Sequence, residues 1–152
     1  MNLTNPNEAF MNLAFREAEK AFEKDECPVG CIIVYENKII AKSHNQVETL
    51  KDPTAHAEIL AITSAAANLE SKILKNCSMY VTLEPCAMCA GAIVLSRMEN
   101  LFFGAFDPKA GACGSVIDIT NNNSLNHKVN VFGGIFDTEC GSILKEFFKK
   151  KR

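Results

Sequence analysis

The chain has 152 residues, 47% of them hydrophobic and 22% charged, and a formal net charge of −2 at pH 7. This length suits one compact domain, residues 1–152, and the composition is ordinary for a globular protein. The small negative charge excludes a general attraction to nucleic acid, although the C-terminal sequence KEFFKKKR concentrates positive charge. The N-terminus has no signal-peptide pattern and no apolar run is long enough to span a bilayer. We therefore expect a cytoplasmic protein with no membrane partner.

Capping, periodicity and turn signals divide the chain into helices and strands. Asn5, Pro6 and Glu8 form a capping pattern that predicts a helix start, and apolar residues at helical spacing follow. In chain order, the first predicted elements are a helix from Pro6 to about Lys24, a hairpin of strands 29–35 and 39–41, and a helix over 56–69. A strand over 78–83, a helix over 85–97 and a strand over 100–103 follow. The rest of the chain is predicted as a loop over 104–128, a strand over 129–132 and a helix over 138–150. This order predicts an α/β fold, a three-layer α/β/α sandwich with a central mixed sheet of about five strands.

The segment TLEPCAMCAGA contains Cys86 and Cys89 in a C-x-x-C arrangement directly after Pro85. Such a pair can be a redox couple, half of a structural zinc site or part of a catalytic zinc site. On a helix that starts at Pro85, both thiols lie in the first turn, where the helix dipole favours their ionisation. Glu84, which precedes this helix, is interpreted as structural.

A second short motif, H-x-E, places His56 and Glu58 at the start of an earlier predicted helix. Two strands of one sheet would bring both helix starts to the same edge, so that His56 joins Cys86 and Cys89. Three protein ligands leave the fourth position of a tetrahedral zinc open for water, as catalysis requires. Glu58 could then take a proton from this water and pass it to a leaving group.

Other readings of the cysteines and histidines remain open at this point. A closed structural zinc site would recruit Cys113 or Cys140 as a fourth ligand, and it would leave Glu58 without a task. Cys27, Cys31 and Cys77 are interpreted as packing residues, and His44 and His127 as hydrogen-bonding loop residues. The total of seven cysteines is odd, and for a chain that we expect in a reducing compartment it does not favour a disulfide framework.

The combination of H-x-E with P-C-x-x-C resembles the signature of zinc-dependent nucleobase deaminases. Longer stretches, PTAHAEI, TLEPCAMCAGAI, FGAFDPKAGACGS and LNHKV, are similar to the bacterial tRNA-specific adenosine deaminase family, and the likeness runs from about residue 8 to residue 152. This resemblance implies a cytidine-deaminase-like fold, a homodimer and one Zn²⁺ per chain. The ligands would be His56, Cys86 and Cys89, with Glu58 as the proton shuttle.

The resemblance also implies a reaction, the hydrolytic deamination of adenosine to inosine at the wobble position of a tRNA anticodon loop. Zinc-hydroxide would attack C6 of an adenine that has splayed out of the loop, and Glu58 would carry the protons. Asn45 would contact the flipped base, and Asp107 could accept a hydrogen bond from a ribose 2′-OH. Phe106, where relatives often carry a charge, could instead stack on a base. The residues that the resemblance places at the substrate are Val29, Asn45, Ala57, Pro85, Asp107, Lys109, Asn126 and His127.

Two alternative functions compete with this one. Deaminases of free bases or nucleosides, such as guanine or cytosine deaminase, share the zinc signature, but they have no need of a long RNA-facing loop and a basic tail. A non-catalytic, zinc-stabilised binding module of the same fold would leave Glu58 without a function. The sequence therefore favours the tRNA-directed enzyme.

Overall fold

The structure, a computed structural model, describes residues 5–151. Its first helix, α1 (Pro6–Glu23), starts as predicted. The side chain of Asn5 accepts a hydrogen bond from the backbone N–H of Glu8 at 2.9 Å, and its amide group donates to the Glu8 carboxylate at 2.8 Å. Pro6 occupies the first turn, where its missing N–H would have no partner within the helix. The capping pattern in the sequence is thus confirmed.

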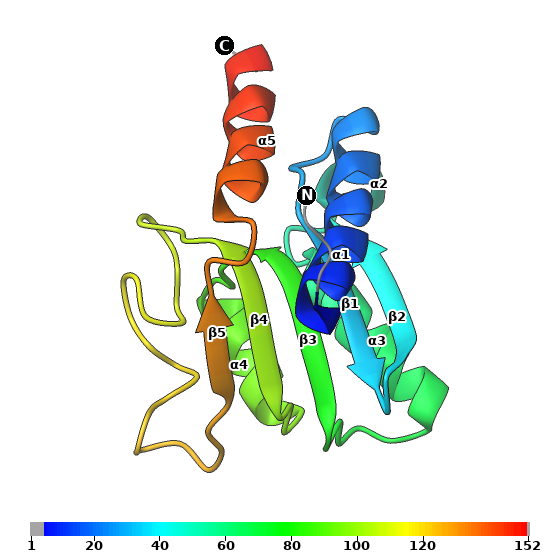
Figure 1. The fold of residues 1–152 in the computed structure, drawn as a ribbon, viewed down its shortest axis with the longest axis vertical. Helices are drawn as coiled ribbons and strands as arrows, with labels where there is room; N and C mark the ends of the chain where they lie inside the picture. The colour runs from blue at the N-terminus through cyan, green and yellow to red at the C-terminus, as the bar shows by residue number, and fades with distance from the viewer. Residues whose placement is uncertain (1–4, 152) are drawn as a thin grey trace.

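A mixed sheet forms the middle layer, with the strand order β2-β1-β3-β4-β5 (Figure 1). The strands are β1 (Gly30–Tyr35), β2 (Lys38–His44), β3 (Cys77–Leu83), β4 (Asn100–Ala105) and β5 (Asn130–Gly133). β1 runs antiparallel to both of its neighbours, β2 and β3, whereas β3, β4 and β5 are parallel to one another. The predicted mixed sheet is confirmed, and each predicted strand is present within one to three residues of its expected limits.

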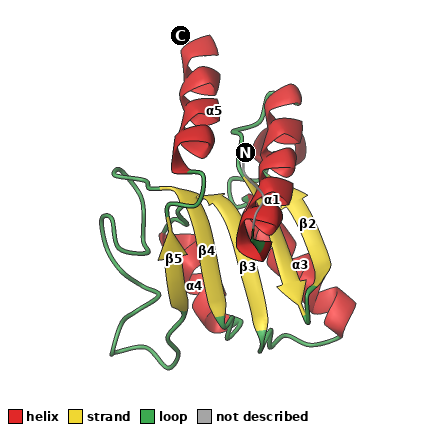
Figure 2. Ribbon diagram, viewed as in Figure 1, coloured by secondary structure: helices red, strands yellow, loops and turns green. Residues whose placement is uncertain are grey.

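Helices cover both faces of this sheet (Figure 2). On one side lies α1, with α5 (Asp137–Lys150) beside its C-terminal half; on the other lie α3 (Ala57–Leu69) and α4 (Ala87–Leu95). A short helix, α2 (Val47–Leu50), lies in a segment that the sequence predicts only as polar loop. In the described part of the chain, no helix has both the length and the apolar character that a membrane span requires.

Two apolar clusters, one on each face of the sheet, explain why β1 is buried almost throughout. Alternate side chains of a strand point to opposite faces. Ile32 and Val34 therefore pack with Met11 of α1, whereas Cys31 and Ile33 pack toward α3 and α4. The larger cluster lies on the α3–α4 side, so the helices that carry both predicted motifs are held against the main core.

Aromatic rings form a continuous row across the α1 side of the sheet. The ring of Phe10 lies 5.2 Å from that of Tyr80, which stacks on Phe102 at 4.5 Å, and Phe102 stacks on Phe132 at 5.0 Å. The hydroxyl of Tyr80 donates a hydrogen bond to Asn7 at 2.6 Å. This row connects α1 to β3, β4 and β5 through side chains alone.

The strand directions bring two helix starts to one edge of the sheet. β2 leads toward α3, and β3 leads into α4. The two strands are not neighbours, because β1 lies between them, but both are antiparallel to β1 and so end at the same edge. The predicted meeting of the two motifs therefore holds, across an intervening strand.

Candidate active site

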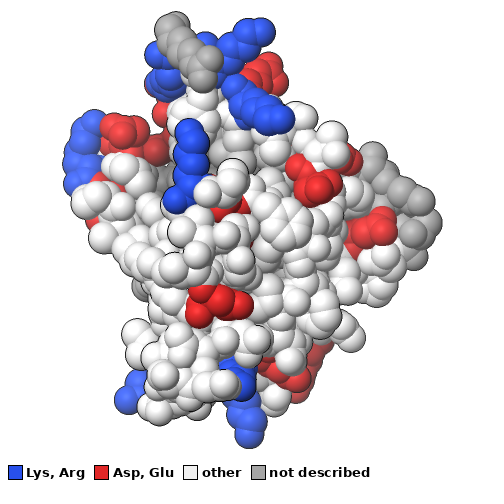
Figure 3. Space-filling model, turned by 90° about the vertical axis from the view of Figure 1, so that its left-hand side faces the viewer, with Lys and Arg blue, Asp and Glu red and all other residues white. Residues whose placement is uncertain are grey.

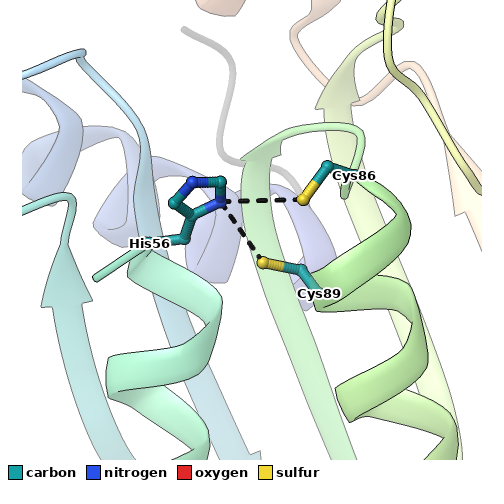
Figure 4. Close-up of side chains that lie close together, drawn as sticks. All are labelled: His56, Cys86 and Cys89. Atoms are coloured by element: carbon teal, nitrogen blue, oxygen red, sulfur yellow. Dashed lines mark hydrogen bonds between the residues drawn. The ribbon is translucent and has the colours of Figure 1, made fainter. Parts of the chain in front are cut away.

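His56, Cys86 and Cys89 form the candidate metal centre at this edge. His56 caps the N-terminus of α3, Cys86 caps that of α4, and Cys89 lies in the first turn of α4. Figure 4 shows the three side chains pointing toward one another from the two helix starts. The Nδ1 atom of His56 lies 3.7 Å from Sγ of Cys86 and 3.5 Å from Sγ of Cys89.

These separations fit a tetrahedral zinc ion. With Zn–N of about 2.0 Å and Zn–S of about 2.3 Å, tetrahedral angles place the nitrogen and sulfur ligands about 3.5 Å apart. The ligand atoms all lie within 4.8 Å of one another, and neither Cys113 nor Cys140 belongs to this cluster. Among the described residues the donor set is therefore three, which favours an open site over the closed structural site.

The pKa values of the two cysteines in the cluster shift in opposite directions. A hydrogen bond from the Cys89 thiol, followed by one from His56, lowers the pKa of Cys86 to about 3. The hydrogen bond that the Cys89 thiol donates to Cys86, followed by burial, raises the pKa of Cys89. The expectation that the helix start favours ionisation of both thiols therefore holds for Cys86 only. One thiolate and an imidazole thus share the site, and soft sulfur with imidazole nitrogen is a donor combination that suits zinc.

Glu58 is the candidate acid–base group beside this cluster. It lies in the first turn of α3 with only 4% of its surface exposed, and it lines the same cleft as His56 and Cys86. Burial raises the pKa of Glu58 to about 7. A carboxyl group with this pKa exchanges a proton readily near neutral pH, which is the property that a proton shuttle requires.

The cleft has a volume of about 830 Å³, and Val29, Asn45, Leu83 and Cys86 are among the residues that line it. The side-chain oxygen of Asn45 accepts a hydrogen bond from the backbone N–H of Ala57 at 2.7 Å. Since the oxygen is engaged, the NH₂ group is the part of Asn45 that a substrate can use. Asn45 thereby fixes the start of α3 and also presents a donor to the cleft.

A second hollow adjoins the cleft, and Asp107 lines both of them. Its lining includes Lys109, Phe106 and Phe148, and it has a volume of about 1110 Å³. Phe106 and Phe148 are each about half exposed, with 54% and 51% of their surface accessible. Two exposed rings beside lysines form a surface on which nucleic-acid bases can stack.

The structure does not bring every predicted substrate residue to these hollows. The ring of His127 bonds to the backbone carbonyl of Met98 at 2.7 Å, and neither Asn126 nor His127 lines the cleft or the second hollow. Ala57 is fully buried and contributes its backbone N–H, and the carbonyl of Pro85 accepts a hydrogen bond from Ala112 at 2.9 Å.

Sequence reasoning does not find one buried residue of the cleft, Glu26. Its carboxylate accepts hydrogen bonds from the backbone N–H groups of Glu48 and Thr49 at 3.0 and 2.6 Å, and from the Thr49 hydroxyl. These bonds hold α2 against the cleft. No motif marks Glu26 in the sequence, because its partners become visible only when α2 is seen to form.

The geometry of the site and the likeness to known proteins indicate the same class of protein. A layered α/β/α domain with H-x-E and P-C-x-x-C at two adjacent helix starts defines a nucleobase deaminase. In agreement, the family model for MafB19-like deaminases matches residues 5–152. The chain is also 53% identical over 145 residues, covering 95% of both proteins, to a tRNA-specific adenosine deaminase of Aquifex aeolicus (strain VF5). It belongs to the tRNA-specific adenosine deaminase family.

Solved structures agree with this placement. The chain superimposes with a TM-score of 0.87, at 42% identity, on a structure from work on A-to-I editing by tRNA:A34 deaminases at the wobble position of transfer RNA, and the match covers 90% of this chain and 99% of that one. A guanine deaminase from Nitrosomonas europaea matches with a TM-score of 0.77 at 25% identity, covering 92% of this chain and 83% of that one. The predicted cytidine-deaminase-like fold is thereby confirmed.

Proposed function

We propose that this protein is a zinc-dependent hydrolase that converts adenosine to inosine at the wobble position of a tRNA anticodon loop. The observation that carries the proposal is the His56–Cys86–Cys89 cluster beside buried Glu58, in a chain 53% identical to a tRNA-specific adenosine deaminase. The enzyme would work in the cytoplasm as one domain, where its RNA substrate is found.

The chain's own residues divide the chemistry between them. His56, Cys86 and Cys89 would hold a zinc ion, which when bound would supply a Lewis acid that lowers the pKa of water toward neutrality. Glu58 would accept one proton from the attacking water and deliver it to N1 of the adenine. It would then take the second proton, from the hydroxyl group formed on C6, and pass it to the departing amine, so that ammonia leaves. The NH₂ group of Asn45 donates to the base and holds it in register with Glu58.

The target nucleotide must leave the stacked loop to reach this cleft. We infer that the second hollow receives nucleotides adjacent to it, because Phe106 and Phe148 offer ring faces and Lys109 offers a cation there. Lysine side chains gather at the C-terminal end of α5 (Figure 3). Lys149, Lys150 and Lys151 would meet the phosphates of the anticodon stem.

The protein is proposed to act as a homodimer. Family resemblance is the basis of this proposal. Exposed apolar side chains are consistent with a protein partner: Leu95 on α4 is 77% exposed, and Val116 and Ile117, in the loop after β4, are more than half exposed. Sedimentation of the purified protein would give a mass near twice 16.7 kDa. A monomer that is fully active would contradict the proposal.

The decisive experiment is deamination of an RNA hairpin that carries an anticodon loop with adenosine at the wobble position. Inosine is copied as guanosine, so sequencing would show conversion at that one adenosine. A Glu58→Ala protein that retains zinc serves as the matched control and should give no conversion. If the zinc-loaded wild-type protein left the hairpin unchanged but deaminated free guanine, the free-base alternative would replace this proposal.

A further inference from the structure

Glu84 is a buried carboxylate with an unusual set of partners. It follows β3 and precedes Cys86 by two residues, and only 1% of its surface is exposed. Among the described residues it takes part in no ion pair. A buried carboxylate needs several hydrogen bonds if no cation balances it, so its donors must come from elsewhere.

All of these donors belong to the loop that follows β4. The Glu84 carboxylate accepts hydrogen bonds from the backbone N–H groups of Asp107 at 3.0 Å, Cys113 at 3.1 Å and Ser115 at 3.0 Å, and also from the Ser115 hydroxyl. A Cβ atom at Gly111 would lie 2.4 Å from the carboxylate carbon of Glu84. The loop is therefore folded closely around this one side chain.

This arrangement connects the metal centre to the wall of the cleft. The backbone of Pro85, between Glu84 and the candidate metal ligand Cys86, accepts a hydrogen bond from Ala112 of the same loop. At the near end of the loop, Asp107 lines both the cleft and the second hollow. A shift of the Glu84 carboxylate would thus move Asp107 relative to Cys86.

We propose that Glu84 is a positioning residue, which acts through Asp107 to hold the RNA-facing loop at a fixed place relative to the candidate metal centre. The inference rests on the proposed function. Glutamine at this position has the same shape, but it offers one acceptor oxygen and replaces the other with an NH₂ group that faces backbone N–H donors. The loop would lose its anchor while the metal ligands remain in place.

The first test is steady-state deamination of the RNA hairpin by Glu84→Gln. Zinc content should equal that of the wild type, and KM should rise about tenfold, the effect of losing one or two hydrogen bonds to a charged group, with a smaller change in kcat. Glu17→Gln is the matched control, since Glu17 is another buried glutamate but lies on α1, where it pairs with Lys20. It should leave KM and kcat unchanged. Should Glu84→Gln fail to fold, Ser115→Ala removes a single donor and should raise KM by a smaller factor.

The second test separates positioning from a general structural role through a double-mutant cycle with Asp107→Ala. If Glu84 acts through Asp107, the Glu84→Gln/Asp107→Ala protein should have the KM of Asp107→Ala alone. Effects that multiply, or an Asp107→Ala protein with wild-type KM, would overturn the inference. A wild-type protein that holds zinc but does not deaminate the hairpin would instead refute the proposed function.

Discussion

His56, Cys86 and Cys89 form the candidate metal centre, and two buried glutamates, Glu26 and Glu84, hold the segments around it. The sequence places His56, Cys86 and Cys89 together because two helix starts at one sheet edge have few other ways to meet. It does not place Glu26 or explain Glu84, since both accept backbone N–H groups from loops whose conformation no local pattern specifies. The motifs in the sequence thus predict the cluster of three side chains but not the loop anchors around it.

The two groups of the Asn45 side chain can be tested separately by substitution. Asn45→Asp keeps the oxygen that accepts from the N–H of Ala57 and removes the NH₂ donor that we assign to the base. With one hydrogen bond lost to the substrate, kcat/KM for the RNA hairpin should fall by about tenfold to a hundredfold, while zinc content stays constant. Metal analysis and initial rates would check both. Unchanged kcat/KM would show that Asn45 has only the structural bond to α3.

At the scale of elements, buried glutamates anchor loops and a glycine permits close packing. Glu26 holds the start of α2 as Glu84 holds the loop after β4, so that each wall of the cleft is attached to the body of the protein by one carboxylate. Gly30 of β1, in contrast, lies in close contact with the backbone of α1. The sequence predicts α1 and β1 individually, but the distance between them depends on tertiary packing.

The anchor at Glu26 should make stability depend on pH. Burial opposes its ionisation, but the hydrogen bonds from Thr49 and the N–H of Glu48 outweigh that effect, so its pKa lies below the ordinary 4.5. A folded-state pKa below the unfolded one stabilises the protein above pH 4.5, and this contribution is lost as the pH falls through the folded-state value. Glu26→Gln should therefore lower the free energy of unfolding by about 1–3 kcal/mol at neutral pH, and by less in acid.

Urea unfolding of Glu26→Gln and the wild type across this pH range would measure the difference. Glu23→Gln, at an exposed position three residues earlier on α1, is the matched control and should change stability little at any pH. A Glu26→Gln effect that stayed constant from neutral to acid pH would refute the assignment.

The contact at Gly30 predicts a packing defect. A Cβ atom there would lie 2.0 Å from the backbone oxygen of Ala14 and 2.4 Å from the backbone nitrogen of Ala18, and helix backbone cannot yield as a side chain can. Gly30→Ala should destabilise the protein by about 1–3 kcal/mol or more. Gly91→Ala, where no heavy atom lies within 4 Å, should instead be neutral or stabilise by about 0.5–1 kcal/mol. Equal unfolding free energies for both variants would contradict this account.

At the scale of the whole molecule, the layered fold follows from patterns that the sequence states clearly. Alternation of helical and β-branched segments predicts the sheet and the helices on both faces, and the structure confirms them. The strand order is harder to predict from the sequence, because no local sequence pattern indicates that β1 lies between β2 and β3. That order bears on the proposed function, since it sets the distance between α3 and α4 and thus the spacing of the candidate metal ligands.

Zinc should contribute to the stability of the whole chain, since its ligands would come from two helix starts. His56 is the N-cap residue of α3, Cys86 is that of α4, and Cys89 lies in the first turn of α4. We predict about one zinc per chain, and removal by a chelator should lower the melting temperature by at least about 5 °C. Cys86→Ala should lose the metal, whereas Cys113→Ala, which alters a cysteine outside the cluster, should retain it. Equal loss of zinc in both variants would indicate a closed, four-ligand site.

The aromatic row across the sheet also gives the protein an intrinsic spectroscopic label. The chain has two tyrosines and no tryptophan, so its near-ultraviolet absorption comes mainly from two phenol rings. One of them, Tyr80, is stacked on Phe102 and bonded to Asn7, and burial raises its pKa to about 12. Separation of α1 from the sheet would transfer this ring to water and shift its absorption band. The packing of α1 against the sheet can therefore be followed by absorption spectroscopy without an added fluorophore or a substitution.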